Sequence, residues 1–573
     1  MSAECSPPHT GHSRRTEQTG QSGHPVHPGQ SGQTPVDGPP AGSSAHSSAQ
    51  EGILRRQSAR ESAARTYARA LPIVPVRARG MTIEGADGRR YLDCLSGAGT
   101  LALGHNHPVV LEAIRKVLDS GAPLHVLDLA TPVKDDFTTE LFGTLPRGLA
   151  ERARIQFCGP AGTDAVEAAL KLVRAATGRE GLLAFTGAYH GMTAGALEAS
   201  GGAQDVRVAR LPYPQDYRCP FGLGGANGAE LSARWTESLL DDTKSGVPAP
   251  AGMILEPVQG EGGVLPAPDA WLRRMREITA ARGIPLIADE VQTGVGRTGT
   301  FWAVEHSGVV PDVMVLSKAI GGSLPLAVVI YRDDLDVWPP GAHAGTFRGN
   351  QLAMAAGAAT LAYVRENGLA ERAAVLGARM LAQLRSLAAD HPCVGEVRGR
   401  GLMLGVELVE AAEPVGPAEP VDPAGFSGPV GPIGPTGFSG HVDAVEPGPE
   451  GTSGTSREAS DRGSAHGSPA GPGAADQASA GREDADRAAT PYDPLAGGAG
   501  ILPSTTRPRP PAPQLAAAVQ RECLRRGLIV ELGGRHSSVV RLLPPLTITD
   551  EQAAAVLDRL ADALATAARA HHG

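Results

Sequence analysis

Lysine is scarce in this chain. Lysine and arginine together account for 52 of 573 residues, yet lysine occurs only as Lys116, Lys134, Lys171, Lys244 and Lys318. Of these, only Lys318 directly follows an apolar, strand-like run, Val313–Ser317. A buried primary amine has a lowered pKa and becomes a nucleophile that can form an imine with an aldehyde. Because a lysine stem also packs on apolar surface with its amine in water, Lys318 alone leaves both interpretations open.

Paired cysteines, basic blocks and long apolar runs are also missing. The six cysteines are scattered singly, no apolar signal segment follows Met1, and no apolar run reaches membrane-spanning length. We therefore expect a reduced, cytoplasmic protein that no membrane helix anchors. The formal net charge is -9 without a basic cluster. This charge pattern argues against nucleic acid or an anionic membrane surface as a partner.

Two segments contain few large apolar side chains. Such segments cannot bury enough surface to offset their chain entropy. We expect a disordered tail over residues 1–55 and a disordered insertion over 409–512. Glycine occurs at every third position from Gly425 to Gly440, which is the collagen period, but the run is short. A flexible insertion is favoured because long surface loops cost little stability.

In the remaining chain, helical patterns alternate with short apolar runs. Helices are predicted over 163–176 and 269–282, and strands over 182–186, 252–256, 285–289, 313–316 and 327–331. This alternation predicts an α/β fold with a mainly parallel sheet covered on both faces. We place a large domain at 109–360, preceded by an N-terminal segment at 56–108. A smaller α/β domain is expected from 361–408 and 513–573, with strands at 401–408, 528–532 and 538–542, a helix over 514–526 and a final helix from 549.

Charged residues follow three of the predicted strands. Glu256, Asp289 and Lys318 each come directly after an apolar run, and ligands of parallel sheets gather at the carboxyl ends of strands. A buried carboxylate at Asp289 would need a cationic partner. In pyridoxal 5'-phosphate enzymes such a partner is the pyridine nitrogen of the cofactor, which the carboxylate keeps protonated. The alternative is that Asp289 caps a following helix.

A glycine turn precedes one strong helix. Gly162 and Thr163 begin this helix, where free backbone N–H groups and the helix dipole favour a phosphate. An ordinary threonine N-cap explains the same residues equally well.

Together these features resemble the class-III aminotransferases of the fold-type-I pyridoxal phosphate enzymes. The resemblance depends on the phosphate turn, on Tyr189-His190-Gly191, on Asp289, and on Lys318 29 residues later. It implies a large domain with a mainly parallel seven-stranded sheet and a smaller α/β domain. It also implies a homodimer that shares its active sites.

The resemblance assigns roles to individual residues. Lys318 would hold the cofactor and then move the substrate proton, and Asp289 would pair with the pyridine nitrogen. The other implied cofactor-binding residues are Gly162, Thr163, Tyr189, His190, Glu256, Gln292 and Thr346, with Tyr189 stacking on the ring, Gln292 reaching its phenolic oxygen, and Thr346 coming from the second subunit.

Two further residues concern the co-substrate. By the resemblance, Arg541 binds the α-carboxylate of 2-oxoglutarate or glutamate, and Glu261 pairs with this arginine while the amine donor is bound. Arg535 is a nearby rival for the same role. Alternatively, Arg541 only makes a surface salt bridge, whose loss would spare activity.

Four stretches resemble one subgroup of the family, at 211–222, 335–341, 345–351 and 531–536. The subgroup interconverts L-2,4-diaminobutanoate and 2-oxoglutarate with L-aspartate 4-semialdehyde and L-glutamate by a ping-pong mechanism. Arg348 stands where many other family members have glycine. Ornithine, lysine or 4-aminobutanoate remain alternative donors, because one methylene changes binding by only about 1 to 3 kcal/mol. An intramolecular aminomutase and a non-catalytic scaffold are the more distant alternatives.

Overall fold

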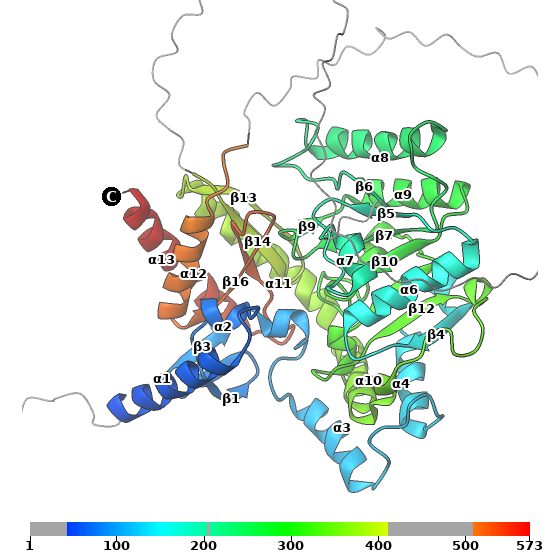
Figure 1. The fold of residues 1–573 in the computed structure, drawn as a ribbon. Helices are drawn as coiled ribbons and strands as arrows, with labels where there is room; N and C mark the ends of the chain where they lie inside the picture. Colours follow the sequence, from blue (N-terminus) through cyan, green and yellow to red (C-terminus); the bar gives the residue numbers. More distant parts are fainter. Residues whose placement is uncertain (1–42, 203–206, 411–507, 573) are drawn as a thin grey trace, which may run out of the picture. The chain divides into compact units, whose positions relative to one another are not determined.

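The computed structural model describes residues 43–202, 207–410 and 508–572 (Figure 1). Residues 1–42 of the predicted tail and residues 411–507 of the predicted insertion lie outside the described residues. The ends of the predicted 409–512 insertion are folded, contrary to the prediction: Val409 pairs with Pro511 in an antiparallel bridge, and Ala512 is buried. Helix α1 (Ser43–Arg60) occupies the end of the segment that we expected to be tail through residue 55. That part of the prediction is wrong: Ile53 and Leu54 of α1 are half-buried, and Gln50 donates a hydrogen bond to the carbonyl of Pro72.

A seven-stranded sheet forms the centre of the larger α/β unit. Its strands lie in the order β4-β12-β11-β10-β7-β5-β6, and β12 runs antiparallel to both of its neighbours. The remaining pairs are parallel, which confirms the predicted mainly parallel α/β sheet. The strands are β4 (Ala153–Phe157), β5 (Leu182–Phe185), β6 (Val208–Leu211), β7 (Gly252–Leu255), β10 (Leu286–Asp289), β11 (Val313–Leu316) and β12 (Val328–Arg332).

Helices cover both faces of this sheet. Successive strand residues point to opposite faces, so Ile287 packs in the cluster with Val173 of α6, whereas Leu286 packs with Met275 of α9. The helices around the sheet are α3 (Pro108–Asp119), α4 (Pro132–Phe142), α5 (Arg147–Ala150), α6 (Gly162–Thr177), α7 (Ala194–Ser200), α8 (Gly225–Asp241), α9 (Asp269–Ala281) and α10 (Gln351–Glu366). Both faces are thus buried, as the continuous apolar strands predicted.

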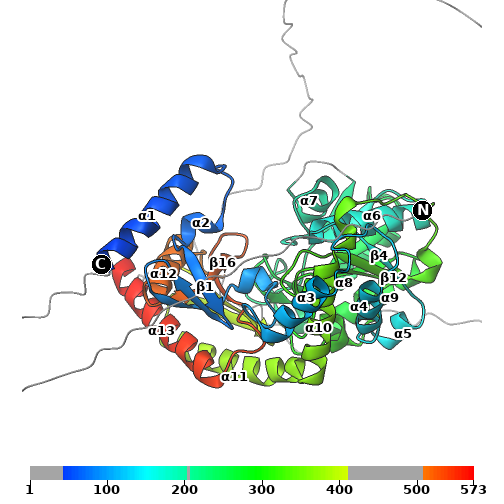
Figure 2. The same ribbon diagram turned by 90° about the horizontal axis from the view of Figure 1, so that it is seen from below.

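Two four-stranded sheets are built from the chain ends and the region before the insertion. One has the order β1-β2-β3-β15 and the other β13-β14-β17-β16. Their strands are β1 (Pro75–Arg79), β2 (Thr82–Gly85), β3 (Arg90–Asp93), β13 (Val394–Arg400), β14 (Met403–Leu408), β15 (Leu528–Ile529), β16 (Glu531–Gly533) and β17 (Val539–Leu542). Helices α2 (Tyr67–Ala70), α11 (Leu369–Ala389), α12 (Pro513–Arg525) and α13 (Asp550–His572) accompany them, and α12 and α13 lie side by side in both views (Figures 1 and 2).

Two predicted strands differ from the structure in this region. The run at 401–408 forms a strand only from Met403, and it pairs in a hairpin with β13, which the sequence patterns did not predict. The single strand expected at 528–532 is divided at Val530 between two sheets. Leu528 pairs parallel with Leu92, whereas Glu531 pairs antiparallel with Arg541. The division depends on partners far away in the sequence, so local patterns cannot reveal it.

Shorter elements complete the described chain. They are β8 (Val258–Gln259), β9 (Leu265–Pro266), η1 (Ser96–Gly99), η2 (Ala303–Ser307), η3 (Lys318–Gly321), η4 (Asp333–Leu335) and η5 (Thr346–Gly349). Among the helices in the described ranges, none combines the length and the apolar character that crossing a membrane requires.

Candidate active site

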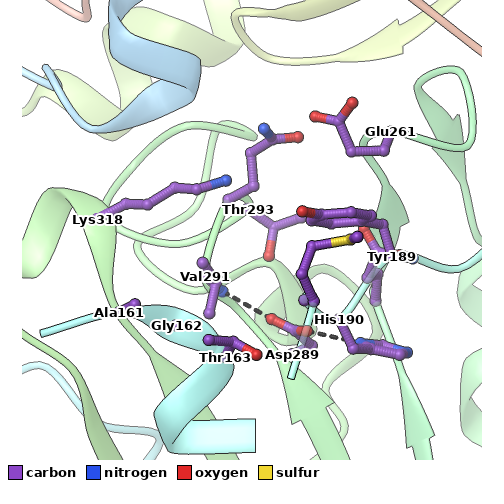
Figure 3. A pocket seen from close by; sticks show the side chains of 14 residues that line it. Ala161, Gly162, Thr163, Tyr189, His190, Glu261, Asp289, Val291, Thr293 and Lys318 are labelled. Carbon is purple, nitrogen blue, oxygen red and sulfur yellow. Dashed lines mark hydrogen bonds and ion pairs between the residues drawn. The ribbon is translucent and has the colours of Figure 1, made fainter. Parts of the chain in front are cut away.

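The carboxyl ends of three neighbouring strands open into one cavity. Strands β11, β10 and β7 lie side by side, and the residues that follow or end them, Lys318, Asp289 and Glu256, line a cavity of about 280 Å³ (Figure 3). Other predicted site residues in its wall are Gly162, Thr163, Tyr189, His190, Glu261 and Gln292. Of the site residues predicted from the sequence, only Thr346 and Arg541 are absent from this wall.

Lys318 has an unusual backbone conformation. Its φ is +52°, in the left-handed region that residues other than glycine seldom adopt. This turn follows the end of β11, and the Lys318 side chain extends into the cavity (Figure 3). Burial lowers the pKa of the Lys318 amine, although the negative charges of Glu261 and Asp289 oppose this effect. Within the described chain, no hydrogen bond or ion pair engages its Nζ, which therefore remains available as a nucleophile.

Asp289 is held on both of its oxygens. Its Oδ2 lies 2.6 Å from His190 Nδ1, and its Oδ1 accepts a hydrogen bond of 3.1 Å from the backbone N–H of Val291. Burial lowers the pKa of His190, but the hydrogen bond and charge of Asp289 outweigh it, so the pKa is raised overall. The next helical element begins only at Ala303. Hence Asp289 does not cap a following helix, and its carboxylate is fixed toward the cavity.

The start of α6 forms another part of the wall. Ala161 occupies the N-cap position, and its N–H donates to the Asp164 carboxylate at 3.0 Å. Thr163 is therefore not the N-cap, and its hydroxyl pairs with that of Thr193 at 2.6 Å. The first N–H groups of an α-helix have no acceptor within the helix. Because Gly162 and Thr163 line the cavity, this end of α6 suits an anion such as a phosphate.

Glu256 organises two loops around the cavity. Its carboxylate accepts hydrogen bonds from the backbone N–H of Tyr189 at 2.9 Å and of Gly260 at 3.0 Å. Burial raises the pKa of Glu256 to about 7. One of these loops presents the Tyr189 ring, which is 44% exposed, to the cavity, and the other leads to Glu261. Glu256 thus positions residues that can contact a ligand.

The side-chain amide of Gln292 uses only one of its two polar atoms in a hydrogen bond among the described residues. Its Nε2 donates to the carbonyl of Ala98 at 3.1 Å, while its buried Oε1 has no hydrogen-bond donor among the described residues. An orphaned buried acceptor is costly, so a protonated ligand group beside it would be stabilised.

Arg541 lies immediately behind Glu261. The Arg541 side chain is fully buried, and its Nη2 lies 2.8 Å from each carboxylate oxygen of Glu261. The alternative of a surface salt bridge is therefore wrong. Arg535, the rival, is exposed and lines a different, small polar cavity with Arg218 and Arg398.

Two further residues join this cluster without having been predicted. Glu531 Oε2 lies 2.6 Å from Arg541 Nη2, and the Tyr67 hydroxyl donates to Glu531 Oε1 at 2.7 Å. A signal for Glu531 was present, because it interrupts the apolar run Leu528–Leu532 as Lys318 interrupts its own. Tyr67 gave no comparable signal, since it lies more than four hundred residues away in the chain.

Thr346 lies away from the cavity of its own chain. It is exposed at the start of η5, and its carbonyl is in contact with the His125 ring. Arg348, in the same turn, pairs with the Asp128 carboxylate at 2.6 Å.

The arrangement fits pyridoxal 5'-phosphate. The cavity offers a helix N-terminus for the phosphate, a buried carboxylate for the pyridine nitrogen, and an unpaired amine for the aldehyde. An exposed aromatic ring and the orphaned Gln292 oxygen match the ring face and the phenolic group. Every polar part of this cofactor thus has a counterpart.

Comparisons with known proteins agree with this geometry. The chain is 48% identical over 522 residues to the diaminobutyrate--2-oxoglutarate aminotransferase of Rhizobium meliloti, covering 90% of this chain and 92% of the relative. It is 50% identical over 366 residues to the enzyme of the same name from Haemophilus influenzae, covering 62% and 80% of the two chains.

Solved structures share the fold. An amine transaminase from an uncultivated Pseudomonas species, in its PLP-bound form, matches with a TM-score of 0.65 and 26% identity, covering 89% of this chain and 98% of that one. The family model "Aminotransferase class-III" matches residues 63–419. The chain therefore belongs to the class-III aminotransferases.

Proposed function

We propose that this protein transfers an amino group between L-2,4-diaminobutanoate and 2-oxoglutarate, forming L-aspartate 4-semialdehyde and L-glutamate. The observation that carries the proposal is the buried Arg541–Glu261 pair beside the cavity that contains Lys318. The relatives from Rhizobium meliloti and Haemophilus influenzae, whose names state these substrates, support the choice of amine.

As a class-III aminotransferase, the protein uses pyridoxal 5'-phosphate. When bound, the cofactor supplies an electron sink that stabilises negative charge at the reacting carbon. Lys318 would attach the cofactor through its aldehyde carbon, and Asp289 would keep its pyridine nitrogen protonated. The remaining contacts would come from Gly162 and Thr163 at the phosphate, Gln292 at the phenolic oxygen and Tyr189 at the ring face.

Lys318 has a second role as a base. Its lowered pKa favours the neutral amine. The Nζ atom can then accept the proton from the substrate carbon and deliver it to the former aldehyde carbon of the cofactor. The left-handed turn fixes the backbone of Lys318, and its flexible side chain lines the cavity.

Glu261 and Arg541 would allow one cavity to accept two different substrates. While the ω-amine of the donor reacts, Glu261 neutralises Arg541 and no carboxylate is needed next to the reacting carbon. When 2-oxoglutarate enters, its α-carboxylate would replace Glu261 on Arg541 through charge-assisted hydrogen bonds. The Arg541 Nε and Nη1 atoms are buried and have no acceptor among the described residues, so they can donate further hydrogen bonds.

We also propose a homodimer in which each subunit completes the site of the other. Apolar side chains of Leu124, Leu127, Leu129 and Phe347 are exposed. Their segments lie side by side, because the Val126 N–H donates to the carbonyl of Gly349 and the Gln351 N–H to that of Leu124. Such a patch is typical of a protein interface. A partner seated there would bring Thr346 to the opposite cavity.

The described cysteines are consistent with a cytoplasmic location. Cys94, Cys158, Cys219, Cys393 and Cys523 are all free thiols. Unpaired thiols persist in reducing compartments.

A half-reaction assay tests the proposed function. Purified protein containing its cofactor receives L-2,4-diaminobutanoate, ornithine, lysine or 4-aminobutanoate separately, and the absorbance change of the cofactor is followed. We expect the fastest change with diaminobutanoate, reversed by 2-oxoglutarate. A faster change with another amine would replace the proposed donor, and turnover without 2-oxoglutarate would indicate an aminomutase.

A further inference from the structure

Arg541 contacts two carboxylates, and the second one has no role in the exchange described above. Glu261 and Glu531 both lie against Arg541 Nη2, at 2.8 and 2.6 Å. One guanidinium therefore faces two carboxylates. If both carboxylates are ionised, the cluster carries one excess negative charge in a largely buried environment. A buried charge without a counter-ion is costly, so this cluster has a need for one more cation.

Within the cluster, the carboxylate oxygen with unused capacity to accept a hydrogen bond belongs to Glu531. Its Oε1 is occupied by the Tyr67 hydroxyl at 2.7 Å. Its Oε2 is close to Arg541 but is buried without a properly aligned hydrogen-bond donor among the described residues. Oε2 can therefore accept a hydrogen bond from an additional donor. Burial raises the pKa of Glu531, and the charge of Glu261 adds to the rise although Arg541 opposes it, as expected of a carboxylate without a full counter-ion.

Tyr67 fixes Glu531 and cannot itself provide the missing cation. Burial and the neighbouring Glu531 raise the pKa of the Tyr67 hydroxyl, so it remains a neutral donor. Lys318, which also lies within electrostatic reach of Glu531, has a lowered pKa and would be occupied by the cofactor, so it does not serve as a permanent counter-ion. An ammonium group of the substrate can supply the balancing charge.

We propose that Glu531 binds the second ammonium group of the amine donor and thereby selects diamino acids over monoamino acids. This inference rests on the proposed function. In L-2,4-diaminobutanoate, the α-ammonium lies only a short chain from the reacting ω-carbon, so it remains near Lys318 and the adjoining cluster. An ammonium there restores charge balance while Glu261 stays on Arg541. In the second half-reaction 2-oxoglutarate brings a carboxylate and no ammonium, so Glu531 gives it no assistance.

Three donors separate the possible roles of Glu531. L-2,4-diaminobutanoate has both a second ammonium and a carboxylate, 1,3-diaminopropane has only the ammonium, and 4-aminobutanoate has only the carboxylate. Each is measured with the cofactor-containing protein as kcat/KM, or as an inhibition constant where turnover is too slow. For Glu531→Gln, we expect both diamines to lose about 10-fold or more, since a hydrogen bond to a charged group is removed. 4-Aminobutanoate should change little, and the KM for 2-oxoglutarate should stay the same or fall.

Matched variants distinguish recognition from a structural defect. Glu531→Asp keeps the charge and should retain most of the preference for diamines. Glu407→Gln removes another buried carboxylate, which pairs with Arg398 and lines the separate small polar cavity. It should leave the ratio between the three donors unchanged.

Equal losses for all three donors in Glu531→Gln, or no loss at all, would overturn the proposal. Wild-type protein provides a check that needs no variant: 1,3-diaminopropane should compete at least about 10-fold better than propylamine, which lacks the second ammonium. Equal competition would also overturn it. If wild-type protein reacts with 2-oxoglutarate but prefers a monoamine donor, the proposed function fails, and this result differs from loss of preference in the variant alone.

Discussion

Arg541 Nη2 lies 2.8 Å from both carboxylate oxygens of Glu261, although 280 positions separate the two residues in the chain. The arginine comes from β17 of a small sheet, and the glutamate from a loop beside the central sheet. The pair thus joins two parts of the fold beside the cavity. We infer that it stays together while the amine donor is bound and separates when the 2-oxo acid enters.

Replacing Arg541 should harm the two half-reactions unequally. Arg541→Ala removes the proposed partner of the 2-oxoglutarate carboxylate, so we expect kcat/KM for 2-oxoglutarate to fall about 100-fold and that for diaminobutanoate to fall much less. Single-turnover rates for each half-reaction are the measurement. Arg535→Ala is the matched control, since Arg535 lines another cavity. An equal loss in both half-reactions would refute the assignment of the carboxylate to Arg541.

Lys318→Ala should abolish transamination and leave the protein folded. The variant would lose both the proposed attachment point of the cofactor and the proposed base, and the described cavity wall contains no second lysine. Steady-state turnover and circular dichroism are the measurements. Lys171→Ala, at an exposed position on α6, should be close to wild type. Turnover near normal in Lys318→Ala would contradict the central role of this lysine.

His190 should control the affinity for the cofactor through Asp289. His190→Phe removes the 2.6 Å contact and leaves a buried carboxylate with less support. We expect the dissociation constant of the cofactor to rise about 10-fold or more, corresponding to roughly 1.5 to 3 kcal/mol for a hydrogen bond to a charged group. Equilibrium dialysis with absorbance detection measures it. Ser200→Ala removes the acceptor of the His190 backbone N–H but leaves the contact with Asp289, so it should have a smaller effect.

Glu256 should make stability depend on pH. Burial raises its pKa from 4.5 to about 7, so within this window the folded protein holds a proton that the unfolded chain has released. The free energy of unfolding must therefore fall as pH rises from about 4.5 to about 7. Above this pH range the lost stability is not regained. Thermal unfolding of wild type and Glu256→Gln at both ends of the window measures the difference. A parallel pH dependence in the two proteins would show that Glu256 is not the group responsible.

Mixed dimers test whether subunits share sites. Lys318→Ala and Thr346→Ala subunits should each be impaired alone. If Thr346 acts in the partner's cavity, a mixed dimer carries both lesions in one site and none in the other, so unfolding and refolding the two variants together should restore activity. Random mixing makes about half of the dimers mixed, and each mixed dimer has one intact site of two. The expected recovery is therefore up to about one quarter of wild-type activity. No recovery in verified mixed dimers would place Thr346 in its own subunit's site or outside catalysis.

Local patterns predicted much of the central sheet. The run Val313–Leu316 is a strand with these same bounds, and α6 differs from its predicted helix by one residue at each end. These segments are apolar throughout or have a clear helical period, so their burial follows from their own residues. The positions of Asp289 and Lys318 at strand ends followed from the same patterns, and the shared cavity agrees with the edge at which parallel strands end.

Tertiary structure decided what those patterns left open. Alone, the residues at 528–532 read as one strand, but pairing with β3 and β17 divides them between two sheets. The same division places Glu531 opposite Arg541, and Tyr67 reaches it from the other end of the chain. The sequence by itself determined which charged side chains lie within or directly after apolar runs and are therefore candidates for chemistry, because a buried charge is costly unless it is paired. Only the fold decided which charges meet, because ion pairs form between residues that are close in space whatever their separation in the chain.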